Sequence, residues 1–328
     1  MNEVTVSITT TGRPAFLRTA LEAVRNQIGV EVIGEVIVSE NSGERATERV
    51  VQEFSDLPIR YLFREPILPM VDHLFSTFRE AHTPYVAILN DDDWWSAGHI
   101  ADGLRTLKAS NAVAYASASE FVVGEGYKDP CWVDRSSAIW LVAGKPSWVG
   151  AWTLDCPEML ALCWLYTPFH WSSLIALTER LVPVLDELER QTYETHTMDR
   201  LVFALMSLHG VLRYNPIPDT FVRWHDGNWV KNQAPTKIQE VLRSTMALVK
   251  GIADRAGCNL TDIWRRALAS MPEDVELDVL WRFREAFSNV ELKQLGFAEF
   301  FHKQPPNSRL IALRNIAANS RKFVLGRS

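Results

Sequence analysis

Cysteine is scarce in this sequence, with four residues among 328. Cys131, Cys156, Cys163 and Cys258 show none of the short paired spacings that a structural zinc site or a redox motif needs. The sequence also lacks the basic start and apolar core of a secretion signal, and it enters a strand-like pattern directly. These features predict reduced thiols and a cytoplasmic location.

The sequence has fewer basic than acidic residues, and its longest uncharged run is interrupted by polar residues and proline. The net charge of -6 and the pI near 5.8 argue against a general nucleic-acid-binding protein, so no nucleic-acid partner is expected. Residues 159–178 carry no Asp, Glu, Lys or Arg over about the length of a membrane helix, but Pro168, His170, Ser172 and Ser173 interrupt the run. A buried strand and helix pair is therefore expected there.

The first third of the chain alternates between strand and helix patterns. Residues 4–9 are β-branched and alternating, and Pro14 then begins a helical pattern. The same alternation follows for residues 35–39 and 44–54, for 59–63 and 70–81, and for 85–89 and 97–107. Four such units predict an α/β fold with a mostly parallel sheet covered on both faces by helices. Ligands of such sheets bind at the carboxyl ends of the strands.

The strand at residues 85–89 leads into three consecutive carboxylates, Asp91, Asp92 and Asp93. Adjacent anions at the end of an apolar strand require a compensating cation. Mg²⁺ or Mn²⁺, bound by one or two carboxylates together with substrate phosphates, supplies that charge. The alternative is a solvated turn in which Asp93 caps the next helix. We accept this alternative for Asp93 and expect metal chemistry at Asp91 and Asp92.

These segments resemble one family. The TTGRP segment at residues 10–14, the VIVSENS strand at 36–42 and the acidic turn at 91–93 occur in the order and at the spacings of nucleotide-sugar-dependent glycosyltransferases of the GT-A fold, family 2. The resemblance extends over about the first 230 residues. It implies a GT-A (Rossmann-like) sheet for this region and assigns expected roles to individual residues.

The resemblance implies that Glu40 accepts a hydrogen bond from the nucleotide base, that Asp91 contacts the ribose and that Asp92 holds the metal against the diphosphate. The donor-binding opening would be Thr10, Thr11 and Arg13, which lacks an aromatic residue common in the family. Asn90 stands where many members carry an aspartate. Its amide can bind a ribose hydroxyl but contributes no charge.

Arg223 and His225 resemble the Arg-x-His segment of the family. Arg223 would pair with phosphate oxygens, and neutral His225 would reach the metal or the diphosphate. For His225 a purely structural role is equally open. His170 and Trp171 lie where the family lines the sugar cleft, and sugar C–H faces stack on aromatic rings. Most of the twelve tryptophans are nonetheless expected in the core.

Inverting transfer also needs a base that removes the proton of the acceptor hydroxyl. By position in the family pattern, Asp199 fits this role, because it precedes a helix that leads to Gly210 and Tyr214. Glu194 is the second candidate. The alternative for Asp199 is a favourable interaction with the dipole of that helix.

The sequence therefore predicts a metal-dependent inverting glycosyltransferase that uses Mn²⁺ or Mg²⁺. The donor would be a nucleotide diphosphate sugar, with UDP favoured over dTDP or GDP, and the acceptor a hydroxyl of a saccharide or lipid-linked saccharide. A sugar nucleotidyltransferase is the enzymatic alternative, but residues 9–14 offer only Gly12 for its glycine-rich loop. A non-catalytic nucleotide-sugar-binding or carbohydrate-binding protein is the other alternative, which turnover would exclude.

Three regions are expected along the chain. Residues 1–235 would form the glycosyltransferase domain, with a nucleotide-binding half at 1–110 and an acceptor half at 111–235, and residues 236–328 a helical C-terminal region. Residues 300–328 contain six Lys or Arg and no Asp or Glu. This bias allows peripheral contact with an anionic membrane surface, at the inner face of a membrane. Packing against the helical region is the favoured alternative.

Overall fold

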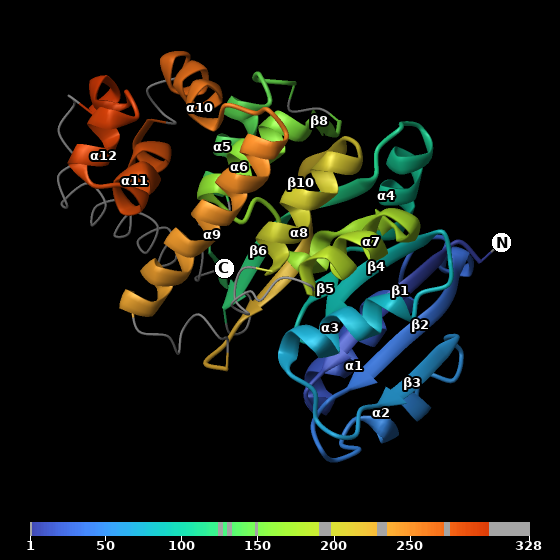
Figure 1. Ribbon diagram of the computed structural model, residues 1–328. Coiled ribbons are helices and arrows are strands. Elements are labelled where there is room, and N and C mark those ends of the chain that lie inside the picture. Colours follow the sequence, from blue (N-terminus) through green and yellow to red (C-terminus); the bar gives the residue numbers. More distant parts are fainter. Residues whose placement is uncertain are drawn as a thin grey trace, which may run out of the picture.

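The computed structural model describes residues 2–123, 127–129, 133–147, 150–189, 198–227, 235–271 and 276–301. In Figure 1 the N-terminal strands and helices lie at the lower right and the C-terminal helices at the upper left. Within the described ranges, no helix combines the length and the apolar character needed to cross a membrane.

The first part of the chain follows the predicted alternation of strands and helices. Its elements are β1 (Val4–Thr10), α1 (Pro14–Arg25), η1 (Val30–Val32), β2 (Ile33–Glu40), α2 (Glu48–Gln52), β3 (Ile59–Phe63), α3 (Met70–Arg79), β4 (Tyr85–Asn90), β5 (Trp94–Trp95) and α4 (His99–Lys108). Strands β3, β2, β1 and β4 are neighbours in that order, and every pair among them is parallel. The four predicted units are confirmed.

The second part mixes short strands with helices. Its elements are β6 (Ala114–Val123), β7 (Tyr127–Asp129), α5 (Val133–Val142), β8 (Trp152–Leu154), α6 (Cys156–Leu165), η3 (Trp171–Ser173), β9 (Ile175–Leu177), α7 (Thr178–Glu189), α8 (Met198–Met206), η5 (Ser207–His209) and β10 (Leu212–Trp224). The described helices that follow are α9 (Pro235–Arg255), α10 (Leu260–Ala269), α11 (Glu276–Ala286), α12 (Asn289–Gln294) and η7 (Ala298–Phe301).

One ten-stranded sheet joins both parts. Eight strands follow the order β3-β2-β1-β4-β9-β6-β10-β5, while β7 pairs with β6 and β8 pairs with β10. The short strand β9 is antiparallel to both β4 and β6, whereas β6 and β10 are parallel. The sheet is therefore mainly parallel with antiparallel insertions. Because β5 pairs with Thr220 and Phe221, the segment that follows the acidic turn is attached to the C-terminal half of β10, the last strand of the described residues.

Helices cover both faces of this sheet, as the sequence predicts. On β4, Ala87 and Leu89 belong to one hydrophobic cluster with α1, α2 and α4. Val86 and Ile88 belong to the other cluster, which includes α3 and the helices of the second part. Since side chains alternate across a strand, each face of β4 has its own core.

Helix α2 is shorter than predicted. The sequence pattern predicts a helix over residues 44–54, but α2 begins at Glu48. The reason is local hydrogen bonding, because the backbone N–H groups of Ala46 and Thr47 donate to the carboxylate of Glu40 instead of entering a helical turn. The predicted range therefore begins with a loop held by a side chain from β2.

The C-terminal helices pack on the second part of the chain. Trp264 of α10 donates from its indole Nε1 to the carbonyl oxygen of Ala161 in α6, at 2.8 Å. Residues of α6, α8, α9, α10 and α11 share one hydrophobic cluster. The division at residue 235 stays a prediction. Residues 302–328, which make up nearly all of the basic segment at 300–328, lie outside the described residues.

Candidate active site

The carboxyl ends of three neighbouring strands bring the predicted donor-site residues together. In the sheet register, Thr10 of β1 lies opposite Glu40 of β2, and Thr9 lies opposite Asn90 of β4. This edge of the sheet therefore carries Thr10, Glu40, Asn90 and the acidic turn that follows β4. The prediction that these strand ends meet is confirmed.

Asp91 is buried and bound to the loop after β1. Thr10 Oγ1 donates to Asp91 Oδ2 at 2.5 Å, and Arg13 donates to Asp91 through Nε at 3.1 Å and through a second, shorter contact. Burial raises the pKa of the Asp91 carboxyl, while the charge and hydrogen bonds of Arg13 oppose that rise. The cation that the sequence requires at Asp91 is thus supplied, in this structure, by Arg13.

Asp92 is the open carboxylate of the turn, with 13% of its side chain exposed against none for Asp91. Its Oδ2 accepts from Arg13 at 3.0 Å and lies 3.1 Å from His225 Nε2. Its backbone oxygen accepts from Arg223 Nε at 3.2 Å. Arg13 and His225 thus converge on one partly exposed carboxylate, and Arg223 binds the backbone of the same residue.

Aromatic rings hold Arg223 in place. Its guanidinium carbon lies 4.9 Å from the ring centroids of both Phe16 and Trp94. The ring of Phe16 also contacts His225, with centroids 5.0 Å apart, and lies under the guanidinium of Arg13. Cation–π contacts of this kind favour a fixed guanidinium orientation. Phe16 therefore links the three side chains that surround Asp92.

The prediction that Asp93 lies in a solvated turn and caps the next helix is wrong. Asp93 is 1% exposed, and the next helix, α4, begins only at His99. Its carboxylate accepts hydrogen bonds from Ser172, from the Asn90 amide and from the Arg223 backbone N–H. Complete burial, and then the charge of Asp92, raise its pKa well above the ordinary value. Asp93 joins the turn to η3 and β10 instead of capping a helix in solvent.

Glu40 is buried beneath the loop that follows β2. Five donors contact its carboxylate: the hydroxyls of Ser42, Thr47 and Tyr61 and the backbone N–H groups of Ala46 and Thr47. Burial alone would raise the pKa of Glu40, but these hydrogen bonds outweigh it and lower the pKa. A carboxylate has about four lone-pair sites. These contacts therefore favour a loop-holding role over the predicted base contact.

Glu40→Gln tests this role. At pH 7 we expect the free energy of unfolding to fall by about 2 kcal/mol, because an amide cannot accept from all five donors. Since the folded pKa of Glu40 is lowered, its contribution is present above the unfolded pKa and is lost as pH falls through the folded value. Urea unfolding at pH 7 and near pH 3 measures both effects. Exposed Glu44→Gln is the matched control, and equal losses in the two variants would contradict the assignment.

Arg13→Gln tests the neutralisation of Asp91. The substitution leaves a buried carboxylate without its partner, so we expect a loss of about 3 kcal/mol in unfolding free energy at pH 7. The loss should shrink on acidification, because the already raised pKa of Asp91 would rise further and the carboxyl would protonate. Arg18, in α1, forms an exposed ion pair with Glu53, so Arg18→Gln should change the unfolding free energy little. Similar losses in both variants would show that Asp91 does not need Arg13.

Other predicted site residues have distinct positions. Thr11 is exposed and is the first residue of the loop after β1. His170 Nδ1 lies 3.5 Å from Asp93 Oδ2, whereas Trp171 packs against the rings of Phe78 and Phe203 in the core. Their predicted roles in the sugar cleft are not tested by these contacts.

The two candidate bases differ in what the structure describes. Asp199 lies in the first turn of α8 and is partly exposed, and its Oδ1 accepts from the backbone N–H of Arg200 at 2.7 Å. That placement agrees with the predicted helix start. Glu194 lies outside the described residues. The choice between the two acids stays a prediction.

Several residues of this edge were not found by sequence reasoning. Phe16 contacts both arginines through tertiary packing, which no local pattern reveals. Arg64 directly follows β3, and that strand-end position was the available signal. Its Nε donates to Ser39 Oγ at 2.9 Å beside His73, whose pKa burial and Arg64 lower to about 4. The guanidinium of Arg64 and the neutral imidazole of His73 thus both contact the Ser39 hydroxyl of β2.

The residues around Asp92 fit a divalent cation bound together with a diphosphate. No cluster of three or more His, Cys, Asp or Glu side chains suited to a metal is found in the described part of the chain. A carboxylate oxygen of Asp92 and a ring nitrogen of His225 nevertheless lie 3.1 Å apart, as two adjacent ligands of one ion would. Mg²⁺ in particular is commonly held by one or two carboxylates, with phosphate oxygens and waters as the remaining ligands.

A mainly parallel sheet with an acidic turn at its carboxyl edge, faced by arginine and histidine side chains, agrees with the GT-A fold that the sequence resemblance implies. Residues 5–138 match the family described as Glycosyl transferase family 2. This part of the chain therefore resembles a family 2 glycosyltransferase domain, and the match supports a glycosyltransferase that uses a nucleotide sugar. No curated protein sequence matches the chain.

Solved structures of S. aureus TarS share this fold. TarS 1-349 in complex with UDP-GlcNAc is 12% identical with a TM-score of 0.55, and the match covers 90% of this chain and 92% of that chain. The complex with UDP is 11% identical with the same coverage and a TM-score of 0.50. A match to a longer TarS chain, also 11% identical with a TM-score of 0.50, covers 92% of this chain but 55% of that chain. The TM-scores show a common fold, and identities this low show nothing beyond the fold.

Proposed function

We propose that this protein is a metal-dependent, inverting glycosyltransferase that transfers a sugar from a nucleotide diphosphate sugar to a hydroxyl of a saccharide or lipid-linked saccharide. The observation that carries the proposal is the setting of Asp92. Its partly exposed carboxylate lies among Arg13, Arg223 and His225 at the carboxyl edge of the sheet. A diphosphate needs such a combination of cations near an acidic metal ligand.

Two features support a uridine diphosphate donor. Titles of the TarS structures name UDP-GlcNAc and UDP as bound molecules, and that protein shares the fold over most of both chains. In the present chain, Arg13 and Arg223 both lie against the ring of Phe16 and offer two guanidinium groups to a diphosphate. We propose UDP as the first choice, with dTDP and GDP as the alternatives to test. The cytoplasm, which the sequence analysis predicts, is the proposed location.

The proposed reaction is a single displacement at the anomeric carbon. The acceptor oxygen forms a bond to that carbon as the bond to the diphosphate oxygen breaks, and the acceptor proton passes to the carboxylate of Asp199. A divalent cation held by Asp92 and His225 would stabilise the negative charge that develops on the nucleoside diphosphate. Arg223, fixed between two aromatic rings, would add a second positive charge at the same place.

A donor panel tests this function. Release of nucleoside diphosphate is measured over UDP-, GDP- and dTDP-sugars with Mn²⁺, with Mg²⁺ and with a chelator. We expect release from one nucleotide class, strongest for UDP, and its loss with the chelator. Metal-independent release would contradict the metal assignment, and absence of release or transfer from every donor would contradict the proposed reaction.

A further inference from the structure

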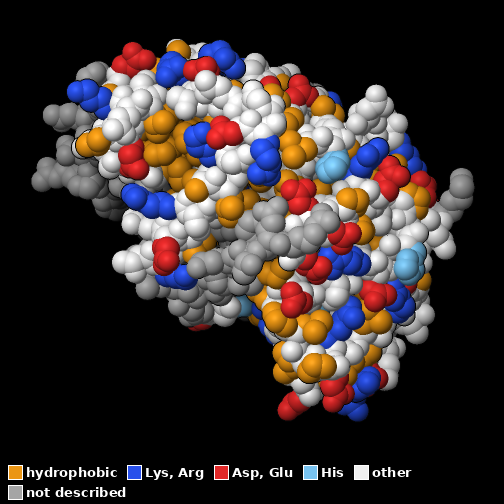
Figure 2. Space-filling model, in the orientation of Figure 1, with side chains coloured by type: hydrophobic (Ala, Val, Ile, Leu, Met, Phe, Trp, Pro, Cys, Tyr) orange, Lys and Arg blue, Asp and Glu red, His pale blue; other side chains and the backbone are white. Residues whose placement is uncertain are grey.

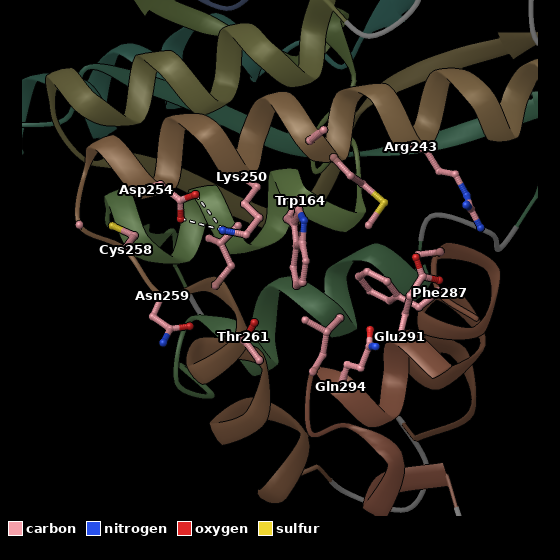
Figure 3. A pocket seen from close by; sticks show the side chains of 16 residues that line it. Trp164, Arg243, Lys250, Asp254, Cys258, Asn259, Thr261, Phe287, Glu291 and Gln294 are labelled. Carbon is pink, nitrogen blue, oxygen red and sulfur yellow. Dashed lines mark hydrogen bonds and ion pairs between the residues drawn. The ribbon is translucent and has the colours of Figure 1, made fainter. Parts of the chain in front are cut away.

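A cavity of about 760 Å³ lies in the C-terminal half of the molecule, among α6, α9, α10 and α12. Figure 3 shows its side chains around an opening between α9 and the helices below it in the view. None of its lining residues belongs to the acidic turn or to the first four strands. Its volume is within the range of sites for small ligands. The proposed transfer reaction does not use it.

The cavity contains a buried tryptophan with a free hydrogen-bond donor. Trp164 is 4% exposed, and its ring lies 5.2 Å from that of Phe287. In the described part of the chain, its indole N–H has no hydrogen-bond partner, whereas the indoles of Trp95 and Trp264 donate to carbonyl oxygens. Figure 3 shows the Trp164 ring standing in the cavity. The indole nitrogen is not itself a buried atom, so its N–H is open to the cavity and available to a ligand oxygen.

Two arginines hold Trp164 in position. Arg200 donates to the carbonyl oxygens of Cys163 and Trp164, and Arg282 donates to that of Leu165 at 2.8 Å. These three carbonyls belong to the last turn of α6, which has no intrahelical donors of its own. The guanidinium groups therefore fix the end of this helix and with it the direction of the indole.

The rim of the cavity is polar and balanced in charge. Lys250 forms an ion pair with Asp254 at 2.8 Å, and Arg243 acts electrostatically on Glu291. Gln294 and Thr261 add an amide and a hydroxyl. In Figure 2, hydrophobic side chains gather over the C-terminal helices at the upper left, among acidic and basic ones. Two carboxylates in the lining disfavour an anion, and the polar rim disfavours a purely apolar ligand.

We propose that this cavity is a second saccharide site, which binds a neutral sugar chain independently of the donor site. A pyranose ring would place its apolar C–H face against Trp164 and Phe287, because saccharides combine such faces with hydroxyl edges. A sugar hydroxyl would accept from the Trp164 indole, and Gln294 and Thr261 would bind the remaining hydroxyls. The chemistry selects uncharged, hydroxyl-rich ligands of a few sugar units.

Saturation-transfer NMR and calorimetry on the full-length protein test the site. The probes are maltotriose, cellotriose and chitotriose, with inorganic phosphate as the anionic comparison. We expect one of the saccharides to bind, and Trp164→Phe, which keeps an aromatic ring but removes the donor, to weaken it about tenfold. Gln294→Ala, at an exposed rim position, should weaken it about threefold. Leu248→Ala, on α9 but outside the cavity lining, should leave it unchanged.

A donor-site variant separates this site from the transfer reaction. Binding of the saccharide should persist in Asp92→Ala, even though that variant is expected to lose donor turnover. The proposal is overturned if no saccharide binds, if Trp164→Phe and Gln294→Ala both bind like the native protein, or if Asp92→Ala abolishes the binding. Binding of phosphate alone, dependent on Arg243, would also overturn it. The donor panel succeeds or fails independently of these results.

Discussion

Asp92→Ala is expected to reduce sugar transfer by roughly 10²- to 10⁴-fold, with the fold intact. Asp92 is the most exposed carboxylate of the acidic turn, and its Oδ2 lies 3.1 Å from His225 Nε2. Removing it takes away both the proposed metal ligand and the group on which Arg13 and His225 converge. Initial rates measured over a Mn²⁺ titration, together with Mn²⁺-dependent binding of UDP, give the size of the effect.

The matched control is Asp102→Ala. Asp102 lies in α4, ten residues after Asp92, and forms an exposed ion pair with Arg105. We expect no change in rate for this variant, because its charge lies outside the site. Native activity of Asp92→Ala without added metal would show that the leaving group is stabilised by the arginines alone.

Asp199→Asn is expected to separate binding from chemistry. The amide keeps the shape and one acceptor oxygen but cannot take up a proton at neutral pH. Donor affinity should therefore persist, while transfer falls by roughly 10²- to 10⁴-fold. Calorimetry with UDP and a transfer assay with the best donor of the panel measure the two quantities separately.

Glu194→Gln is the paired control for the base. Transfer at the native rate in Asp199→Asn, combined with loss in Glu194→Gln, would assign the base to Glu194. Unchanged rates in both variants would reject a carboxylate base. If Asp199 only favours the dipole of α8, its substitution should change stability by about 0.3–1 kcal/mol and leave transfer unaffected.

The strand ends of this protein could be predicted because their pattern is local. The alternation at β1 and β4 depends on successive side chains, and parallel strands place their carboxyl ends at one edge. Thr10, Glu40 and Asn90 were therefore expected to meet before any contact was known. The GT-A resemblance depended on the same ordered segments, and the family match over residues 5–138 confirms it.

The roles of individual charges could not be predicted in this way. Asp91, Asp92 and Asp93 look alike in sequence, yet Asp91 and Asp93 are buried and only Asp92 is partly exposed. Arg13 pairs with Asp91 and Asp92 but not with Asp93. Glu40 likewise lies at the predicted strand end, but donors from the loop and from β3 occupy its carboxylate. The sequence locates a carboxylate at the edge of the sheet without showing which groups reach it.

By itself, then, the sequence determined the α/β order and the edge that carries the acidic turn, because these depend on periodicity and on short motifs. The class of enzyme was implied by the resemblance of those motifs to a known family. Only the tertiary structure decided that Arg13 neutralises Asp91, that His225 meets Asp92 and that Trp164 faces a cavity. The first two contacts join residues 78 and 133 positions apart. Electrostatic and packing energies depend on distance in space and on exclusion of water, and neither quantity is encoded in a local pattern.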